Sequence, residues 1–395
     1  IRVEHYGYSS PEIVEEKQKR YLGIMQSWLE THPEDYIVRS HAAMTYYIQG
    51  KLDQAIEEYQ RIIDDGNAHS DRNLVIETTS TLYLGRCLMR QQKYEDALPY
   101  LLDAQKMDDQ YVISNLTLGE CYTRMARHKD ALEALNQALE FENQVTFSAT
   151  DMTSAKYSIR FFKGQNLEAL ERFGEAADFY KQAADADPKR GDALGRLSGI
   201  YRLLGQRDDA IGAIDEALNR DPDNAQYRFN RGTFYLELGN ETEAVRWFKR
   251  ALEKNPDMPE PYLNLGYVMR RQGDLKTAEE MYVQAVDRSD DTAYEAHANF
   301  AHLLLDQARY GEADALLEEV QNRNPNLTDI LLGLCVTRAH KGALDDVRML
   351  LGPILSAVYG GTLQMAIPDQ AGVNDLAALL SECGNMLSQQ EQGVC

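Results

Sequence analysis

Apolar residues recur along most of the chain at the three- and four-residue intervals that place side chains on one face of a helix. The predicted helices come in pairs, and the pattern has a fixed period. Gly232 in one first helix is followed by Gly266 in the next first helix, 34 residues on. Such a period is typical of repeat proteins, in which each unit buries its apolar face only against its neighbours. We therefore expect an all-α solenoid built from helical hairpins, each with a first and a second helix.

Residues of three kinds occupy fixed places in this period. Small residues in the first helix allow the second helix of the same hairpin to come close: Gly85, Gly119, Gly164, Gly232 and Gly266. An alanine series does the same from the second helix: Ala55, Ala97, Ala131, Ala176, Ala210, Ala244, Ala278 and Ala313. Bulky residues fill the space between hairpins: Tyr46, Tyr59, Tyr122, Tyr180, Tyr201, Tyr235, Phe248 and Tyr282. Prolines, which cannot continue a helix, close the helices: Pro33, Pro188, Pro222, Pro256 and Pro325.

This arrangement resembles the tetratricopeptide repeat, whose signature is a Leu-Gly and a Tyr in helix one, a Gly at the turn, then Ala, an aromatic residue and Ala in helix two, and a closing Pro. The resemblance implies a right-handed superhelix of about nine hairpins. Eight first helices are expected to begin near Tyr36, Thr78, Val112, Tyr157, Gly191, Ala225, Pro259 and Tyr294. A ninth hairpin, from Thr328 to about Leu355, departs from the signature, since Arg338 replaces the Tyr and Val347 the small Ala.

The period divides the chain into segments. Residues 1–9 form a strand or linker, 10–33 an N-terminal helix, 34–143 the first three repeats, 144–156 an insertion, 157–327 repeats four to eight, and 328–395 the ninth hairpin with a C-terminal capping helix. Extra residues precede Thr78 and Tyr157. They either lengthen a first helix, capped by a Ser, Thr or Asp, or form a surface insertion.

Composition and charge exclude several classes of function. The formal net charge of -22 disfavours a nucleic-acid or anionic-membrane surface, because phosphate binding needs clustered Lys and Arg. The five cysteines form no CxxC pair and the histidines no metal-binding pattern, so we expect no metal and no cofactor. Asp185-Ala186-Asp187 imitates the carboxylate pair of a nucleotide-sugar enzyme, but it precedes Pro188 at the predicted end of a helix. No catalytic residue is predicted, and we expect a cytoplasmic protein of undetermined oligomeric state.

The candidate binding residues are those that the superhelix turns inward on its first helices. Asn230, Asn264 and Asn299 stand two residues before the small residue of three successive repeats, and an amide can both donate to and accept from a peptide backbone. They resemble the asparagine ladder of O-GlcNAc transferase, which implies a grip on extended main chain; alternatively, they are consensus residues only. Beside them we place Arg196, Arg202, Tyr267 and Arg270, as a locally basic groove for a carboxylate or acidic peptide, or as a solvated helix face.

The first residues alternate apolar and polar side chains through Ile1, Arg2, Val3 and Glu4, as a half-buried strand does. The stretch up to Pro33 resembles the junction in bacterial family 2 glycosyltransferases that carry a tetratricopeptide tail, at Val3, His5, Tyr6, Gly7, Tyr8, Lys17, Arg20 and Pro33. The resemblance implies the non-catalytic C-terminal region of such an enzyme, binding a protein or peptide. The alternative is a free-standing adaptor that assembles a protein complex.

Overall fold

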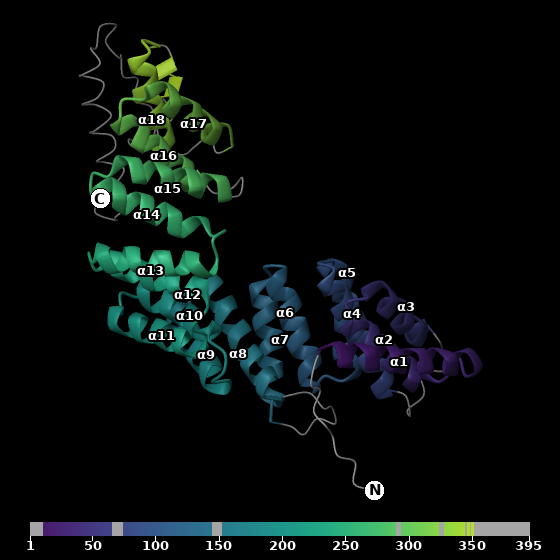
Figure 1. Cartoon of the computed structure of the whole chain (residues 1–395). Helices are drawn as coiled ribbons and strands as arrows, with labels where there is room; N and C mark the ends of the chain where they lie inside the picture. The colour runs from purple at the N-terminus through teal and green to yellow at the C-terminus, as the bar shows by residue number, and fades with distance from the viewer. Residues whose placement is uncertain are drawn as a thin grey trace. The chain divides into compact units, whose positions relative to one another are not determined.

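The computed structural model describes residues 11–64, 74–143, 152–289, 294–323, 328–343, 346–347 and 349–350. Over these residues the chain forms 18 helices and no strand (Figure 1). The predicted all-α solenoid of helical hairpins is confirmed. The strand expected at the start of the chain and the C-terminal capping helix lie outside the described residues.

Contacts divide the chain into two compact units, Ile1–Asp221 and Pro222–Cys395, which we call unit 1 and unit 2. Unit 1 begins with α1 (Pro11–Thr31). Its hairpins are α2 (Tyr36–Ile48) with α3 (Leu52–Asp64), α4 (Leu74–Arg90) with α5 (Tyr94–Met107), α6 (Val112–Arg124) with α7 (His128–Phe141), α8 (Met152–Ala169) with α9 (Phe173–Ala186), and α10 (Asp192–Leu203) with α11 (Arg207–Arg220). Unit 2 contains α12 (Ala225–Glu237) with α13 (Glu241–Lys254), α14 (Pro259–Arg271) with α15 (Leu275–Arg288), α16 (Tyr294–Asp306) with α17 (Tyr310–Arg323), and α18 (Thr328–His340).

Two first helices are longer than the others. The helix α4 has 17 residues and α8 has 18, whereas α2, α6, α12, α14 and α16 have 13 each. These two therefore begin before the expected Thr78 and Tyr157, at Leu74 and Met152. Residues 74–77 thus extend α4 ahead of the expected start, and residues 152–156 of the predicted insertion belong to α8.

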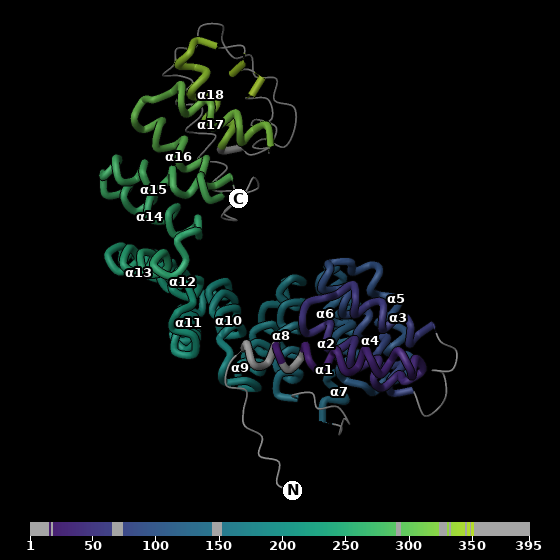
Figure 2. Tube along the Cα trace, turned by 45° about the vertical axis from the view of Figure 1, so that its right-hand side comes forward, coloured from purple at the N-terminus to yellow at the C-terminus, as the bar shows by residue number. Residues whose placement is uncertain are grey.

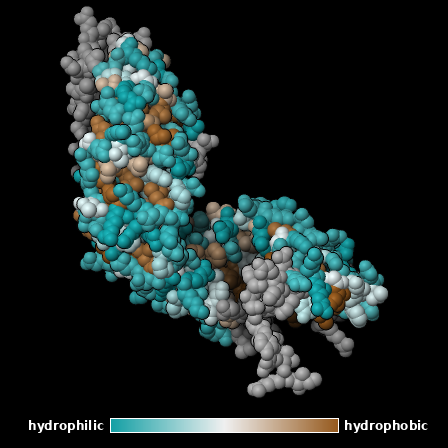
Figure 3. Space-filling view, in the orientation of Figure 1, coloured by the Kyte–Doolittle hydropathy of each residue, from teal (hydrophilic) through white to brown (hydrophobic). Residues whose placement is uncertain are grey.

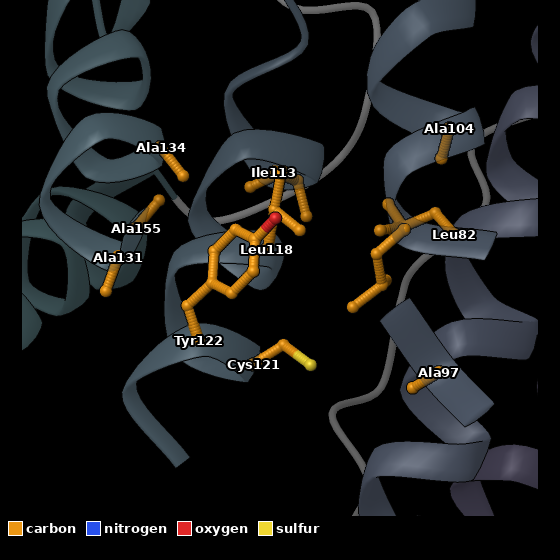
Figure 4. Packing of buried hydrophobic residues seen from close by; sticks show 11 residues of the cluster. Leu82, Ala97, Ala104, Ile113, Leu118, Cys121, Tyr122, Ala131, Ala134 and Ala155 are labelled. Atoms are coloured by element: carbon orange, nitrogen blue, oxygen red, sulfur yellow. The ribbon is translucent and has the colours of Figure 1, made fainter. Parts of the chain in front are cut away.

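The small residues act as expected. A Cβ atom added at Gly85, Gly119, Gly164, Gly232 or Gly266 would lie between 2.5 and 2.7 Å from a Leu, Tyr or Phe side chain of the second helix. Every alanine of the predicted series is fully buried. In unit 1, Figure 4 shows Ile113, Leu118 and Tyr122 of α6 between Ala131 and Ala134 on one side and Leu82 and Ala97 on the other. Within each unit, the core is therefore built from contacts between neighbouring helices.

Two residues after the end of each first helix stands a residue of left-handed backbone conformation. Glycine fills this place at Gly50, Gly205, Gly239, Gly273 and Gly342, and other residues fill it at Gln92, Ala126, Glu171 and Ala308, with φ between 55° and 61°. The predicted prolines follow the second helices closely: α9, α11 and α13 each end two residues before Pro188, Pro222 and Pro256. Backbone geometry thus sets both the turn after each first helix and the end of the second helix.

Each unit holds one of the two tryptophans. The Trp28 ring of α1 stacks on the His32 ring with centroids 3.9 Å apart, and its Nε1 donates a hydrogen bond to Asp35 at 2.9 Å. In α13 of unit 2, Trp247 lies beside the guanidinium groups of Arg231 and Arg250, at 5.9 and 4.9 Å from Cζ to ring centroid. The two indoles therefore have different surroundings.

Candidate functional site

The first helices of neighbouring hairpins contact one another in both units. In unit 1, α2 contacts α4, α4 contacts α6 and α6 contacts α8; in unit 2, α14 contacts α16 and α16 contacts α18. The tube drawing lets the reader follow these rows (Figure 2). We call the face that each row presents the first-helix surface of its unit. A chain laid across such a surface would meet residues of equivalent position at one-repeat intervals.

The three predicted asparagines all lie on first helices of unit 2 and are all half-buried. Asn230 of α12 accepts a hydrogen bond from Gln226 at 3.1 Å, and Asn299 of α16 donates one to the carbonyl of Glu295 at 2.8 Å. Both bonds stay within one helix and leave the other half of the amide available. Asn264 of α14 makes no side-chain hydrogen bond to any residue that the structure describes. Of the three helices, α14 and α16 are in contact, so Asn264 and Asn299 lie on neighbouring first helices.

The three predicted arginines lie in both units, and two of them are paired with carboxylates of the protein itself. Arg270 of α14 forms an ion pair of 2.6 Å with Asp306 of α16. In unit 1, Arg196 lies 3.6 Å from Glu168 of α8, and Arg202 is exposed near the end of α10. Because Arg196 and Arg270 each face a carboxylate, they contribute little net positive charge to their surroundings.

Tyr267 of α14 adds an aromatic surface to the row in unit 2. Its side chain is 40% exposed, although most large apolar residues of the described helices are buried. The guanidinium of Arg271 lies 5.7 Å from its ring centroid, and Arg271 itself pairs with Glu241 at 3.4 Å. Figure 3 shows that the face toward the viewer is largely hydrophilic, with separate apolar areas. Tyr267 is thus an exposed, partly fixed ring next to the asparagine row.

The structure also brings together residues that the sequence did not single out. A pocket of about 380 Å³ in unit 1 is lined by Tyr47, Arg86, Met89, Arg90, Tyr94 and Glu120, among others. These residues come from α2, α4, the start of α5 and α6. One signal was present in the sequence: Arg90 and Arg124, which also lines the pocket, stand 34 residues apart in equivalent places of two repeats.

The residues that imitate catalytic motifs have structural roles. Asp187 follows the last residue of α9, and its carboxylate accepts a hydrogen bond from the amide of Lys189 at 3.1 Å, as in an ordinary helix end. Cys87 and Cys121 are buried, and burial raises the pKa of their thiols to about 12 and about 11. Both are therefore protonated at neutral pH and poorly nucleophilic.

Within the ranges given above, no group of three or more His, Cys, Asp or Glu side chains could hold a metal ion. None of the helices described combines the length and the apolar character needed to cross a bilayer.

Four family models of the tetratricopeptide repeat match the chain, over residues 76–143, 167–228, 200–259 and 247–280. The chain thus contains tetratricopeptide repeats, as the sequence predicted, with matches in both units. No curated protein matches it.

Solved structures share the fold. A tetratricopeptide repeat protein from Parabacteroides merdae is 15% identical, with a TM-score of 0.51 over 68% of this chain and 98% of its own. The chain is also similar to PilF of Pseudomonas aeruginosa, at 15% identity and a TM-score of 0.47 over 56% of this chain and 96% of PilF. YrrB, a repeat protein with an unusual peptide-binding site, is 17% identical, with a TM-score of 0.39 over 50% of this chain and 93% of its own.

Proposed function

We propose that this chain, an array of tetratricopeptide repeats, is a non-catalytic scaffold that holds an extended segment of a partner protein on the first-helix surface of unit 2. One observation carries the proposal: Asn264 and Asn299 lie on adjoining first helices with unused hydrogen-bonding capacity. An extended main chain offers donors and acceptors in alternation, which suits side-chain amides spaced along a row. Asn230 extends the row on α12, and Tyr267 supplies an exposed ring for an apolar side chain of the partner.

The test removes the amides and leaves the hairpins intact. Peptides selected from a random display library on the full chain are titrated against wild type and the double variant Asn264→Ala, Asn299→Ala. Each lost hydrogen bond should weaken binding by about 0.5 to 1.5 kcal/mol. The matched control is Asn322→Ala, because Asn322 is exposed on the second helix α17 of the same unit.

The controls also decide what the asparagines do. Unchanged affinity in the double variant would mean that they are consensus residues only. A double variant with a lower free energy of unfolding than the Asn322→Ala control would mean that their partners are inside the protein.

A second, more specific hypothesis concerns the longer protein to which this chain would belong. We infer that the chain is the C-terminal region of a bacterial glycosyltransferase, from the resemblance that ends at Pro33; a free-standing adaptor is the alternative. Lys17 and Arg20 of that stretch lie on α1, and residues 1–9 lie outside the described part of the chain. The upstream coding sequence decides between the two, since the first requires a nucleotide-sugar domain there. We expect no sugar-nucleotide hydrolysis by this chain alone, and activity abolished by Asp185→Asn with Asp187→Asn would contradict that expectation.

A further inference from the structure

The pocket in unit 1, which we call the Arg86 pocket, joins aromatic and cationic groups on the first-helix surface. The guanidinium carbons of Arg86 and Arg90 lie 5.8 and 4.9 Å from the ring centroid of Tyr47. Arg86 also lies 5.0 Å from the ring centroid of Tyr83. Two positive charges therefore converge on one tyrosine, and cation–π contacts of this kind leave guanidinium N–H groups for other partners.

No carboxylate that the structure describes forms an ion pair with either of these two arginines. Arginines of unit 1 commonly have a carboxylate within 4.0 Å, as do Arg39, Arg61, Arg127, Arg160, Arg172 and Arg190. Arg86, in contrast, makes no hydrogen bond or ion pair with any described residue. Among the described residues, Arg90 donates only to the backbone carbonyl of Tyr47, at 2.7 Å. The whole chain carries a net charge of -22, yet these two arginines, one helical turn apart, have no acidic partner among the described residues.

The single carboxylate of the pocket does not remove this excess. Glu120 lies 3.7 Å from the guanidinium of Arg124, its neighbour one turn along α6. That pair is largely self-compensating, so the net charge near Arg86 and Arg90 stays positive. Met89 and Tyr94 add apolar surface to the lining, which a charged group with a hydrocarbon stem can cover.

We propose that the Arg86 pocket binds the side-chain carboxylate of an Asp or Glu in a partner peptide, with Arg86 as the bidentate partner and Arg90 beside it. A planar guanidinium matches a carboxylate through two parallel hydrogen bonds, and an anion between the two arginines relieves their mutual repulsion. The sequence assigned the preference for acidic peptides to Arg196 and Arg270, among others, but these two have acidic partners of their own. We assign it to Arg86 and Arg90 instead. The inference rests on the proposed peptide-binding function and adds the chemistry of the peptide.

The experiment is a selection from a random 12-residue peptide library displayed on phage, carried out on the full chain. Three proteins are compared: wild type, Arg86→Met with Arg90→Met, and the control Arg207→Met. Arg207 is an exposed arginine on the second helix α11 of the same unit, so its replacement changes net charge without touching the pocket. Circular dichroism establishes that all three are folded equally.

We expect Asp and Glu to be enriched in peptides selected on wild type and on the Arg207→Met control, and not on the double variant. For the strongest peptide, replacing its enriched acid by the matching amide should weaken binding to wild type about tenfold or more, and hardly alter binding to the Arg86→Met, Arg90→Met variant.

Three results would overturn the proposal in different ways. Selected peptides that lack acidic enrichment, but lose affinity for the Asn264→Ala, Asn299→Ala variant, would reject the Arg86 pocket and leave the scaffold function standing. A selection that yields no binding peptide at all would reject both. Acidic enrichment that persists on the Arg86→Met, Arg90→Met variant would show that the acid binds elsewhere.

Discussion

Gly119 shows how one hydrogen atom in place of a methyl group sets the distance between two helices. A Cβ atom at this position would lie 2.5 Å from Cγ of Leu135, which is fully buried. Gly119→Ala should therefore destabilise the protein by about 1 to 3 kcal/mol, because the core must shift to admit the methyl group. The measurement is urea denaturation followed by circular dichroism.

The matched control for this prediction is Gly212→Ala in α11. Gly212 lies within a helix of the same unit, and nothing lies within 4 Å of an added Cβ atom. This substitution should stabilise by about 0.5 to 1 kcal/mol, since alanine loses less backbone entropy on folding. If Gly119→Ala and Gly212→Ala changed the free energy of unfolding equally and in the same direction, the close approach at Gly119 would have no energetic consequence.

Ala126 occupies the left-handed turn position that other hairpins give to glycine. Its φ is 55°, a conformation in which a Cβ atom is crowded by the following carbonyl. We expect Ala126→Gly to stabilise by about 0.5 to 1 kcal/mol, even though glycine is more flexible when unfolded. Gly205→Ala, at the equivalent turn with φ of 72°, should change the free energy of unfolding in the opposite direction. A loss of stability in Ala126→Gly would mean that backbone entropy exceeds the strain.

At the scale of the element, the contact between α17 and α18, which joins two hairpins, is stabilised by a buried ionic cluster. Where the repeat signature has a tyrosine, Arg338 of α18 pairs with Asp314 of α17 at 3.0 Å. Asp314 is buried, accepts a hydrogen bond from Thr337 at 2.6 Å and pairs with Lys341. Burial would raise the pKa of this carboxyl group, but the hydrogen bonds from Lys341 and Thr337 and the charges of Arg338 and Lys341 outweigh it, so the pKa lies below its usual value.

Asp314→Ala should destabilise the contact between α17 and α18 by about 1 to 3 kcal/mol at pH 7. A lowered pKa adds stability above the unfolded value of about 4, and this stability is lost as the pH falls through the lower folded value. The difference between variant and wild type should therefore shrink at acidic pH, measured as hydrogen exchange of α17 and α18.

The control for Asp314 is Glu319→Ala, which breaks an exposed pair of 2.8 Å with Arg323 on the same α17 helix. A surface pair of this kind contributes about 0 to 1 kcal/mol. If both substitutions change the free energy of unfolding equally little, the buried cluster does not stabilise the contact between α17 and α18.

The sequence predicts the helices better than the binding residues. Helix limits depend on residues close together in the sequence, whereas the binding residues depend on how distant helices pack. Gly266 and Pro256 mark a close contact or a helix end through local geometry, and the hairpin limits follow from them. The pairing of Arg270 with Asp306 depends on how α14 and α16 are rotated against each other, which no residue spacing reports. The Arg86 pocket was missed for the same reason, since Tyr47 and Arg86 come together only when α2 and α4 are packed.

At the scale of the whole molecule, stability is expected to be local. Each repeat contacts its sequence neighbours, so the effect of a substitution should fade within a few helices. Ala244→Leu overfills a fully buried site beside Phe248 and should cost about 1 to 3 kcal/mol. Hydrogen exchange should accelerate in α12 to α15 and remain unchanged in α2 to α7. A uniform acceleration along the chain would indicate that the array unfolds as one cooperative body.

The placement of Trp28 in unit 1 and Trp247 in unit 2 gives each unit its own fluorophore. Trp28 is stacked on an imidazole and Trp247 is flanked by guanidinium groups, so their emission spectra should differ. Replacing either by phenylalanine leaves a single emitter that follows one unit through a denaturant titration. The natural sequence is therefore already labelled for distinguishing the unfolding of its halves, without an attached dye.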